Sequence, residues 1–195
     1  VVAWGMPRFN QNNEGQARVP ADLTGVTAIE AGYAHSLALK DDGSVVAWGG
    51  NKGGQLEVPM REAGVMAISA GAWQGFALHD DGSVEAWGNN DLGQTDVAHL
   101  ANISSVSGGY WHAIALKNDG TVMAWGDNEF GQRAVPLGLS DVVAVAAGGE
   151  HSVVLKRDGS LVAWGRNDLG QATIPSELVP GSKTSVSLEV AVIPP

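Results

Sequence analysis

The sequence has no cysteine, few basic side chains and no long apolar run. Without cysteine the chain forms no disulfide, although this alone does not identify a cellular compartment. Its 21 acidic and 11 basic side chains give a formal charge of −10, whereas nucleic-acid binding needs a basic surface that displaces phosphate counterions. No apolar run approaches the roughly 20 residues that span a bilayer. The composition therefore argues against nucleic-acid binding and membrane insertion.

What the sequence contains instead is a repeat. The phrase Val-Ala-Trp-Gly or a close variant occurs five times, and each copy is followed by a loop that ends in Gly-Gln. Successive tryptophans lie 44, 39, 38 and 39 residues apart. A period near 40 residues indicates a chain built of repeated supersecondary units. The tryptophans are Trp4, Trp48, Trp87, Trp125 and Trp164, and the loops end at Gln16, Gln55, Gln94, Gln132 and Gln171.

Each unit predicts four short strands. Apolar strands at 113–117 and 121–125 flank Asn118-Asp119-Gly120, a hairpin signal because glycine accepts positive φ at a tight turn. A further strand precedes each hairpin, as at Val26–Ala31, and an extended stretch reaching Val-Pro or Ile-Pro follows most Gly-Gln loops. Four antiparallel strands in about 39 residues make one propeller blade. We therefore predict an all-β propeller with four clear blades, strands buried on both faces, incomplete terminal material and almost no helix.

Strand direction predicts which loops share an end of the propeller. The Gly-x-x-His loops and the loops from Trp-Gly to Gly-Gln fall at one end, which we call the His end. The Asp-Gly turns and the connections after proline fall at the opposite end, which we call the Asp-Gly end.

The repeats resemble those of the regulator of chromosome condensation family, and more closely the short bacterial repeats of beta-lactamase inhibitory protein II. The resemblance rests on Ala-Gly-Tyr-Ala-His-Ser-Leu-Ala-Leu-Lys-Asp-Asp-Gly-Ser-Val-Val-Ala-Trp-Gly at 31–49 and its three sequels, and covers residues 1 to about 175. It implies a propeller, usually seven-bladed, that mostly binds proteins. In the inhibitor, the His end is the contact face that the resemblance implies.

This chain departs from the family pattern at both ends. It has only four Gly-x-x-His hairpins, and it opens on a third strand, Val1–Trp4. We assign residues 1–180 to the propeller repeats and 181–195 to a strand-like tail that either closes a blade or begins a following segment. We expect a five-bladed ring sealed by this tail, or an incomplete ring finished by further residues, a partner chain or another domain.

His35, His112 and His151 occupy one repeat position, where the remaining copy has Gln74. One interpretation is a ring of imidazoles that holds a metal. The other is that each side chain hydrogen-bonds backbone at the start of a blade, where glutamine can replace histidine as donor and acceptor. Gln74 and the lack of His-x-x-x-His pairs favour the second interpretation. We therefore predict no metal and no cofactor.

Two other repeated residue types also favour structural roles. The Asp-Gly turns place Asp42, Asp81, Asp119 and Asp158 at the tips of different blades, where aspartate is a favoured turn residue rather than one of a catalytic pair. The repeated tryptophans could form a stacking platform for sugars or bases. Their regularity instead favours packing within the repeat. We predict no catalytic residues and no enzyme activity.

Aromatic residues that differ between copies give the best candidate site. The loops before the His position carry Tyr33, Trp73, Tyr110 and Trp111, with Glu150 in the last copy. The loops before Gly-Gln add Phe9 and Phe130. Large apolar side chains on exposed loops over a rigid scaffold suit a protein-binding surface. Each one could instead be a partly buried loop anchor.

Two functions fit this pattern. The first is a non-enzymatic module that binds another protein through these loops, extracellular or at the surface of a bacterial cell. The second is a structural or assembly domain of a larger surface protein, with contacts through the blade edges and residues 184–195. Nucleotide exchange on a small GTPase is disfavoured because no large inserted loop is present.

Overall fold

The computed structural model describes residues 1–3, 14–59 and 64–178. These residues form four antiparallel sheets of three strands each. Within every sheet, neighbouring strands follow one another in chain order. Sheet A contains β1 (Val26–Ala31), β2 (His35–Lys40) and β3 (Val45–Gly49), and sheet B contains β4 (Val65–Ala70), β5 (Gln74–His79) and β6 (Val84–Gly88). Sheet C contains β7 (Ile103–Gly108), β8 (His112–Lys117) and β9 (Val122–Gly126), and sheet D contains β10 (Val142–Ala147), β11 (His151–Lys156) and β12 (Leu161–Gly165).

The only helix among the described residues is the 3-10 turn η1 (Ser176–Leu178), so the all-β prediction is confirmed for them. No helix in this part of the chain is long and apolar enough to cross a membrane. The predicted hairpins are also confirmed. Their turn glycines, Gly43, Gly82, Gly120 and Gly159, have φ between 75° and 84°, the left-handed region that glycine enters without steric cost.

The predicted fourth strand is wrong for the described residues, because every sheet has three strands. After each third strand the chain forms turns, and an asparagine side chain holds them by accepting a hydrogen bond from the backbone N–H five residues later. Asn51 Oδ1 accepts from Leu56 and Asn90 Oδ1 accepts from Thr95, both at 2.9 Å. A strand would need these N–H groups for its hydrogen-bond ladder, and Pro59, which follows Leu56, has no N–H to donate.

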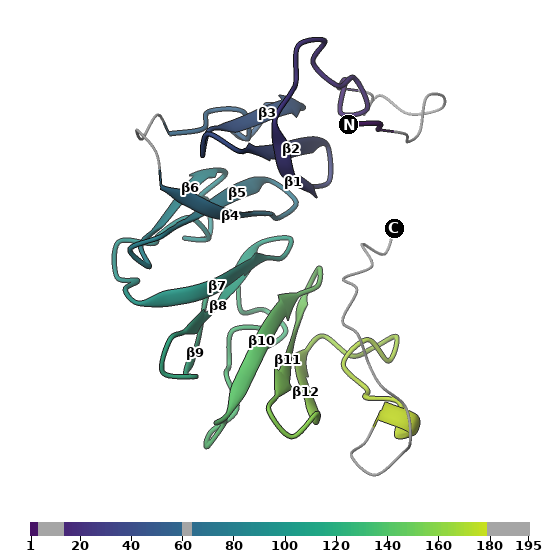
Figure 1. The fold of residues 1–195 in the computed structure, drawn as a ribbon. Helices are drawn as coiled ribbons and strands as arrows, with labels where there is room; N and C mark the ends of the chain where they lie inside the picture. The colour runs from purple at the N-terminus through teal and green to yellow at the C-terminus, as the bar shows by residue number, and fades with distance from the viewer. Residues whose placement is uncertain (4–13, 60–63, 179–195) are drawn as a thin grey trace.

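The four sheets follow one another along an arc, with sheet A at one end and sheet D at the other (Figure 1). Three apolar clusters fill the junctions between neighbouring sheets. In β5, Phe76 and Leu78 join the cluster shared with sheet C, whereas Ala77 joins the cluster shared with sheet A. The central strand is therefore buried on both faces, as the apolar composition predicted.

Strand register confirms the predicted separation of the loops. His35 pairs with Gly49 and Leu39 pairs with Val45, so the loop before β2 and the loop after β3 lie at the same end of sheet A. The same pairing recurs in the other three sheets. The Asp-Gly turns lie at the opposite end. Trp4, Phe9 and the predicted tail at 181–195 fall outside the described residues.

Candidate protein-binding surface

The repeat tryptophans connect neighbouring repeats. In every described copy the indole Nε1 donates a hydrogen bond to the backbone carbonyl of the Gly-Gln glutamine in the preceding repeat. The four bonds join Trp48 to Gln16, Trp87 to Gln55, Trp125 to Gln94 and Trp164 to Gln132, at 2.8 to 2.9 Å. All four indoles are buried. The structural interpretation of these tryptophans is confirmed, because buried rings offer no stacking platform.

The side chain of the same glutamine shapes the loop at the His end. Gln94 Oε1 accepts the backbone N–H of Leu92 at 2.9 Å, and Gln132 Oε1 accepts that of Phe130 at 2.9 Å. Gln171 makes the equivalent bond to Leu169. Because Gln94 and Gln132 are buried while Leu92, Phe130 and Leu169 are exposed, each loop presents one large apolar side chain from a fixed base.

The loops before the His position are joined from sheet to sheet by backbone hydrogen bonds. Ala72 N–H donates to the Gly109 carbonyl at 3.0 Å, and Tyr110 N–H donates to the Gly149 carbonyl at 3.0 Å. Tyr33 N–H donates to the Ala72 carbonyl at 3.4 Å. These loops therefore form one continuous rim across all four sheets. Nothing in the sequence indicated these bonds.

The rim brings together three of the predicted site residues. The ring centroids of Tyr33 and Trp73 lie 5.5 Å apart with the planes tilted by 36°. Those of Trp73 and Trp111 lie 6.2 Å apart with the rings stacked at 17°. We call Tyr33, Trp73 and Trp111 the aromatic row. Tyr33 is 45% exposed and both indoles are half-buried, so the row presents a partly open apolar surface.

Glu150 and Phe130 meet in a second group, through a residue that the sequence did not single out. The guanidinium of Arg166 lies 4.9 Å from the centre of the Phe130 ring, a cation–π distance. Arg166 also pairs with Glu150 and, at 2.6 Å, with Asp168. Hydrogen bonds from Asp168 and Glu150 raise the pKa of Arg166 above its ordinary value. We call Phe130, Glu150 and Arg166 the Arg166 group.

Tyr110 lies in the same rim, with its ring beside Gly149, and is 37% exposed. Of the seven predicted site residues, the structure thus places three in the aromatic row, two in the Arg166 group and Tyr110 in the loop that joins sheet C to sheet D. Phe9 lies outside the described residues.

The His position is buried in three of the four sheets. Gln74 Nε2 donates to the Gly109 carbonyl at 3.0 Å and its Oε1 accepts the Trp73 N–H at 3.0 Å, so backbone bonding is confirmed there. The prediction is wrong at His35, whose ring nitrogens have no hydrogen-bond partner among the described residues. His112 Nε2 lies 3.1 Å from Ser152 Oγ, a side-chain partner.

Burial lowers the pKa of His35 to about 4, and burial together with the nearby His151 lowers that of His112 to about 4. Both rings are therefore neutral near pH 7. The described parts of the chain contain no group of three or more His, Asp or Glu side chains arranged to hold a metal ion.

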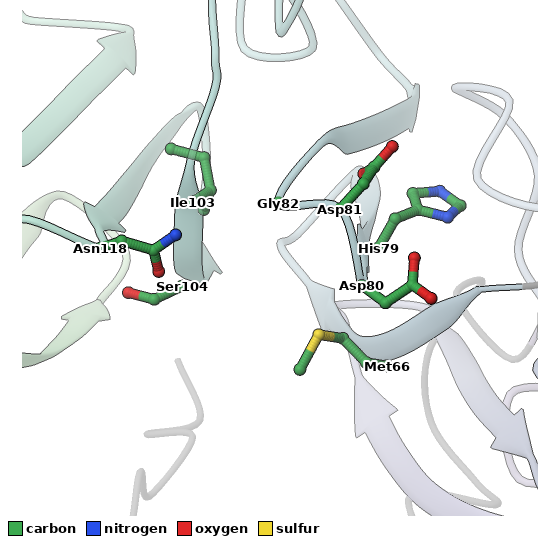
Figure 2. Close-up of a pocket in the computed structure, with 8 residues that line it drawn as sticks. All are labelled: Met66, His79, Asp80, Asp81, Gly82, Ile103, Ser104 and Asn118. Atoms are coloured by element: carbon green, nitrogen blue, oxygen red, sulfur yellow. The ribbon is translucent and has the colours of Figure 1, made fainter.

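At the Asp-Gly end, aspartate side chains hold the turns and a pocket opens between two sheets. Asp81 Oδ1 accepts hydrogen bonds from the backbone N–H and hydroxyl of Ser83, and the aspartates of the other three turns make the same pair of bonds. These aspartates therefore stabilise turns, as the sequence predicted. A pocket of about 240 Å³ lies between sheets B and C at this end, bordered by Met66, Asp80 and Asn118 (Figure 2). His79 also borders it, and its Nε2 lies 3.4 Å from Glu85.

Comparison with known proteins shows what the repeat and the fold are similar to. Residues 26–55, 103–132 and 142–171 match the family model described as the regulator of chromosome condensation (RCC1) repeat. Each match runs from a first strand to a Gly-Gln glutamine, so three of the four described copies are similar to the RCC1 repeat along most of their length. A search of curated protein sequences gives no match.

Solved structures show the same fold at low sequence identity. Human WBSCR16 is 24% identical with a TM-score of 0.65, over 80% of this chain and 51% of that one. The CRINKLY WD40 ectodomain of the Arabidopsis thaliana receptor kinase ACR4 is 23% identical with a TM-score of 0.57, over 80% of this chain and 52% of that one. Prp20p from Saccharomyces cerevisiae is 20% identical with a TM-score of 0.58, over 92% of this chain and 65% of that one. The chain thus spans between about half and two thirds of these proteins.

Proposed function

We propose that this chain of RCC1-like propeller repeats is a non-enzymatic protein-binding module whose contact surface is the rim at its His end. The observation that carries the proposal is the aromatic row, in which side chains from three sheets meet on a rim joined by backbone hydrogen bonds. Tyrosine and tryptophan are enriched among the residues that contribute most to binding at protein interfaces.

The rim is suited to binding because its geometry is fixed before a partner arrives. The backbones of the loops before the His position are bonded to one another, and the loops after β6 and β9 are each held by a buried glutamine. Side chains that are already ordered lose less conformational entropy on association. The Arg166 group adds a charged and aromatic contact beside the row, with Arg166 already oriented by two carboxylates.

Proteins with this fold provide a precedent for protein partners. A crystal structure shows Kap60 bound to yeast RCC1 (Prp20), and Prp20p is also described with binding properties to Gsp1p and histones. For the present chain, the formal charge of −10 favours a partner with a basic surface over a nucleic acid. The resemblance to short bacterial repeats supports an extracellular or cell-surface bacterial module, which fractionation of the source cells would test.

The experiment that tests the proposal is differential capture. The wild-type protein, the variant with both Trp73→Ala and Trp111→Ala, and the control Met66→Ala would be immobilised at equal density. Met66 is a suitable control because it is a large exposed apolar residue at the Asp-Gly end. We expect the natural partner to be retained by wild type and Met66→Ala and lost by the double variant. If all three folded proteins retain the partner, the aromatic row is not the interface. Contacts through the blade edges, as in the assembly alternative, would then be favoured.

A further inference from the structure

The surface at the His end already holds one cation against an aromatic ring. In sheet D, the Arg166 guanidinium lies 4.9 Å from the centre of the Phe130 ring. It also pairs with the carboxylates of Glu150 and Asp168. A ring and a carboxylate together favour a guanidinium, because the ring face attracts its charge and the carboxylate accepts its N–H groups. Sheet D thus fills a cation-binding arrangement with its own side chain.

Strand register puts Arg166 and Glu150 in directly opposed positions, and the same positions recur in sheet C. The Arg166 N–H donates to the Glu150 carbonyl at 2.9 Å, and the two side chains form an ion pair. In sheet C the equivalent bond runs from the Asp127 N–H to the Trp111 carbonyl at 2.8 Å. Directly opposed residues of an antiparallel pair project to the same face. The Asp127 carboxylate therefore lies on the same face as the Trp111 indole.

The Asp127 carboxylate is oriented by its own loop. Its Oδ1 accepts the Glu129 N–H at 3.1 Å, and its Oδ2 accepts a hydrogen bond from Gln132 Nε2 at 2.8 Å. Each carboxylate oxygen has a second lone pair, so the group can also accept hydrogen bonds from a guanidinium. Asp127 is half-buried and Glu129 is exposed, so a partner can approach both residues.

The loops beside the two tryptophans of the aromatic row carry negative charge and no basic residue. The segments 89–94 and 127–132, which follow β6 and β9, contain three carboxylates and no lysine or arginine. None of these carboxylates forms an ion pair within the described ranges, whereas Lys52 in the loop after β3 is paired with Glu14 at 2.6 Å. A cation from a partner would therefore meet carboxylates whose charge is not already neutralised by a basic side chain of these ranges. They belong to Asp91, Asp127 and Glu129.

Trp111 ends the aromatic row on the side of sheet D. Trp73 has ring neighbours from two sheets, Tyr33 and Trp111, whereas Trp111 has only Trp73 among the described residues. The Trp111 side chain is half-buried, so part of it stays accessible. The row thus ends at an accessible indole with the Asp127 carboxylate opposite it in the register.

We propose that the aromatic row binds a protein segment that presents an arginine side chain, which stacks on Trp111 and pairs with Asp127 and Glu129. This inference rests on the proposed function and specifies the chemistry of the partner. Charge complementarity supports it, and Arg166 shows the same combination of ring and carboxylate in the adjacent sheet. Arginine suits the site better than lysine, because a planar guanidinium can stack on a ring and bind a carboxylate through two N–H groups.

Selection from a random dodecapeptide library displayed on phage tests this chemistry directly. The library would be selected on the wild-type protein, on Asp127→Asn and on the variant with both Trp73→Ala and Trp111→Ala. Asp127→Asn should keep the loop intact, because Asn89 Oδ1 makes the equivalent bonds in sheet B. Asp80→Asn changes the net charge equally at the exposed Asp-Gly end and is the matched control.

We expect peptides selected on wild type and on Asp80→Asn to be enriched in arginine by about threefold or more, and peptides selected on Asp127→Asn to lose this enrichment. A synthetic peptide of the selected sequence should bind Asp127→Asn about fivefold more weakly than wild type. Replacing its arginine with uncharged citrulline should weaken binding to wild type more than binding to Asp127→Asn, as expected of two groups in contact.

The outcomes separate this inference from the function on which it rests. Peptides that need Trp73 and Trp111 but show no arginine enrichment would overturn the arginine site and leave protein binding by the row in place. An arginine enrichment that persists on both Asp127→Asn and Glu129→Gln would do the same. Recovery of the same peptides on wild type and on the double tryptophan variant would contradict both proposals.

Discussion

Trp87 Nε1 donates a hydrogen bond to the Gln55 carbonyl, 2.9 Å away and 32 residues earlier in the chain. The indole belongs to sheet B, whereas Gln55 belongs to the loop that follows sheet A. The bond therefore ties one repeat to the next, and the same bond occurs at every described tryptophan of the repeat. The indoles of Trp87, Trp125 and Trp164 also pack into the apolar clusters at the three junctions between sheets, so these junctions depend on this residue.

Replacing Trp87 should destabilise the fold in two separable steps. Trp87→Phe keeps an apolar ring but leaves the buried Gln55 carbonyl without this donor, at a cost of about 1–3 kcal/mol. Trp87→Ala also leaves a cavity and should cost on the order of 3–5 kcal/mol. Urea unfolding followed by circular dichroism measures both. Near-native stability of the alanine variant would contradict the packing role of the tryptophan.

The buried glutamines should stabilise the loops at the His end. Gln94→Met keeps the side-chain volume but removes the bonds to Leu92 N–H and Asn89 Oδ1, so we expect a loss of about 1–3 kcal/mol in unfolding free energy. Gln171→Met is the matched control, because Gln171 occupies the same repeat position but is half-exposed. Equal losses in the two variants would show that burial of the glutamine does not determine its contribution.

Acid should destabilise the fold through its buried histidines. Folding lowers the pKa of His35 and His112 from 6.5 to about 4, so the unfolded state binds more protons between these values. Stability is therefore fully present above pH 6.5 and is lost as the pH falls toward 4, by on the order of 3 kcal/mol for each histidine. Denaturant titrations from pH 7.5 to 4 measure the slope.

Glutamine variants provide the control for that slope. The chain itself uses Gln74 at this position in sheet B, where the side chain is fully buried. His35→Gln and His112→Gln should each flatten the loss of stability between pH 6.5 and 4, because glutamine does not titrate. An unchanged slope in the double variant would assign the acid sensitivity to other groups.

Metal removal should leave the fold intact. A structural metal contributes its binding free energy to folding, so a chelator lowers the melting temperature of a protein that depends on one. We expect the same melting temperature before and after dialysis against EDTA. A melting temperature that falls by many degrees and recovers when zinc is added would instead support a metal site formed by the repeat histidines.

Much of the fold follows from local sequence signals. Short apolar runs on either side of an Asp-Gly turn predict the hairpin of each sheet, and a further apolar run before it predicts the first strand. These signals are local, since a turn such as Asn118-Asp119-Gly120 depends only on adjoining residues. The fourth strand could not be judged in the same way. Whether the chain after Gln55 extends or turns depends on Asn51 accepting a backbone bond, a choice between two conformations that propensity does not resolve.

The sequence predicts where the candidate site lies, but not how its side chains contact one another. Repeat alignment puts Tyr33, Trp73 and Trp111 in equivalent loops, which predicts a common end of the molecule. The contacts between their rings depend on the spacing between sheets, which the sequence does not encode locally. Arg166 had no signal at all, because the corresponding positions in other copies hold Gly50, Asn89 and Asp127.

The measurement that tests the central claim most directly is calorimetric titration of the natural partner into Trp73→Ala and Trp111→Ala, beside wild type and Met66→Ala. If the aromatic row is the contact surface, each tryptophan variant should bind more weakly by about 2 kcal/mol or more, with its circular dichroism spectrum unchanged. Met66→Ala should bind as wild type does. Wild-type affinity in both folded tryptophan variants would contradict the account and place the interface elsewhere on the molecule.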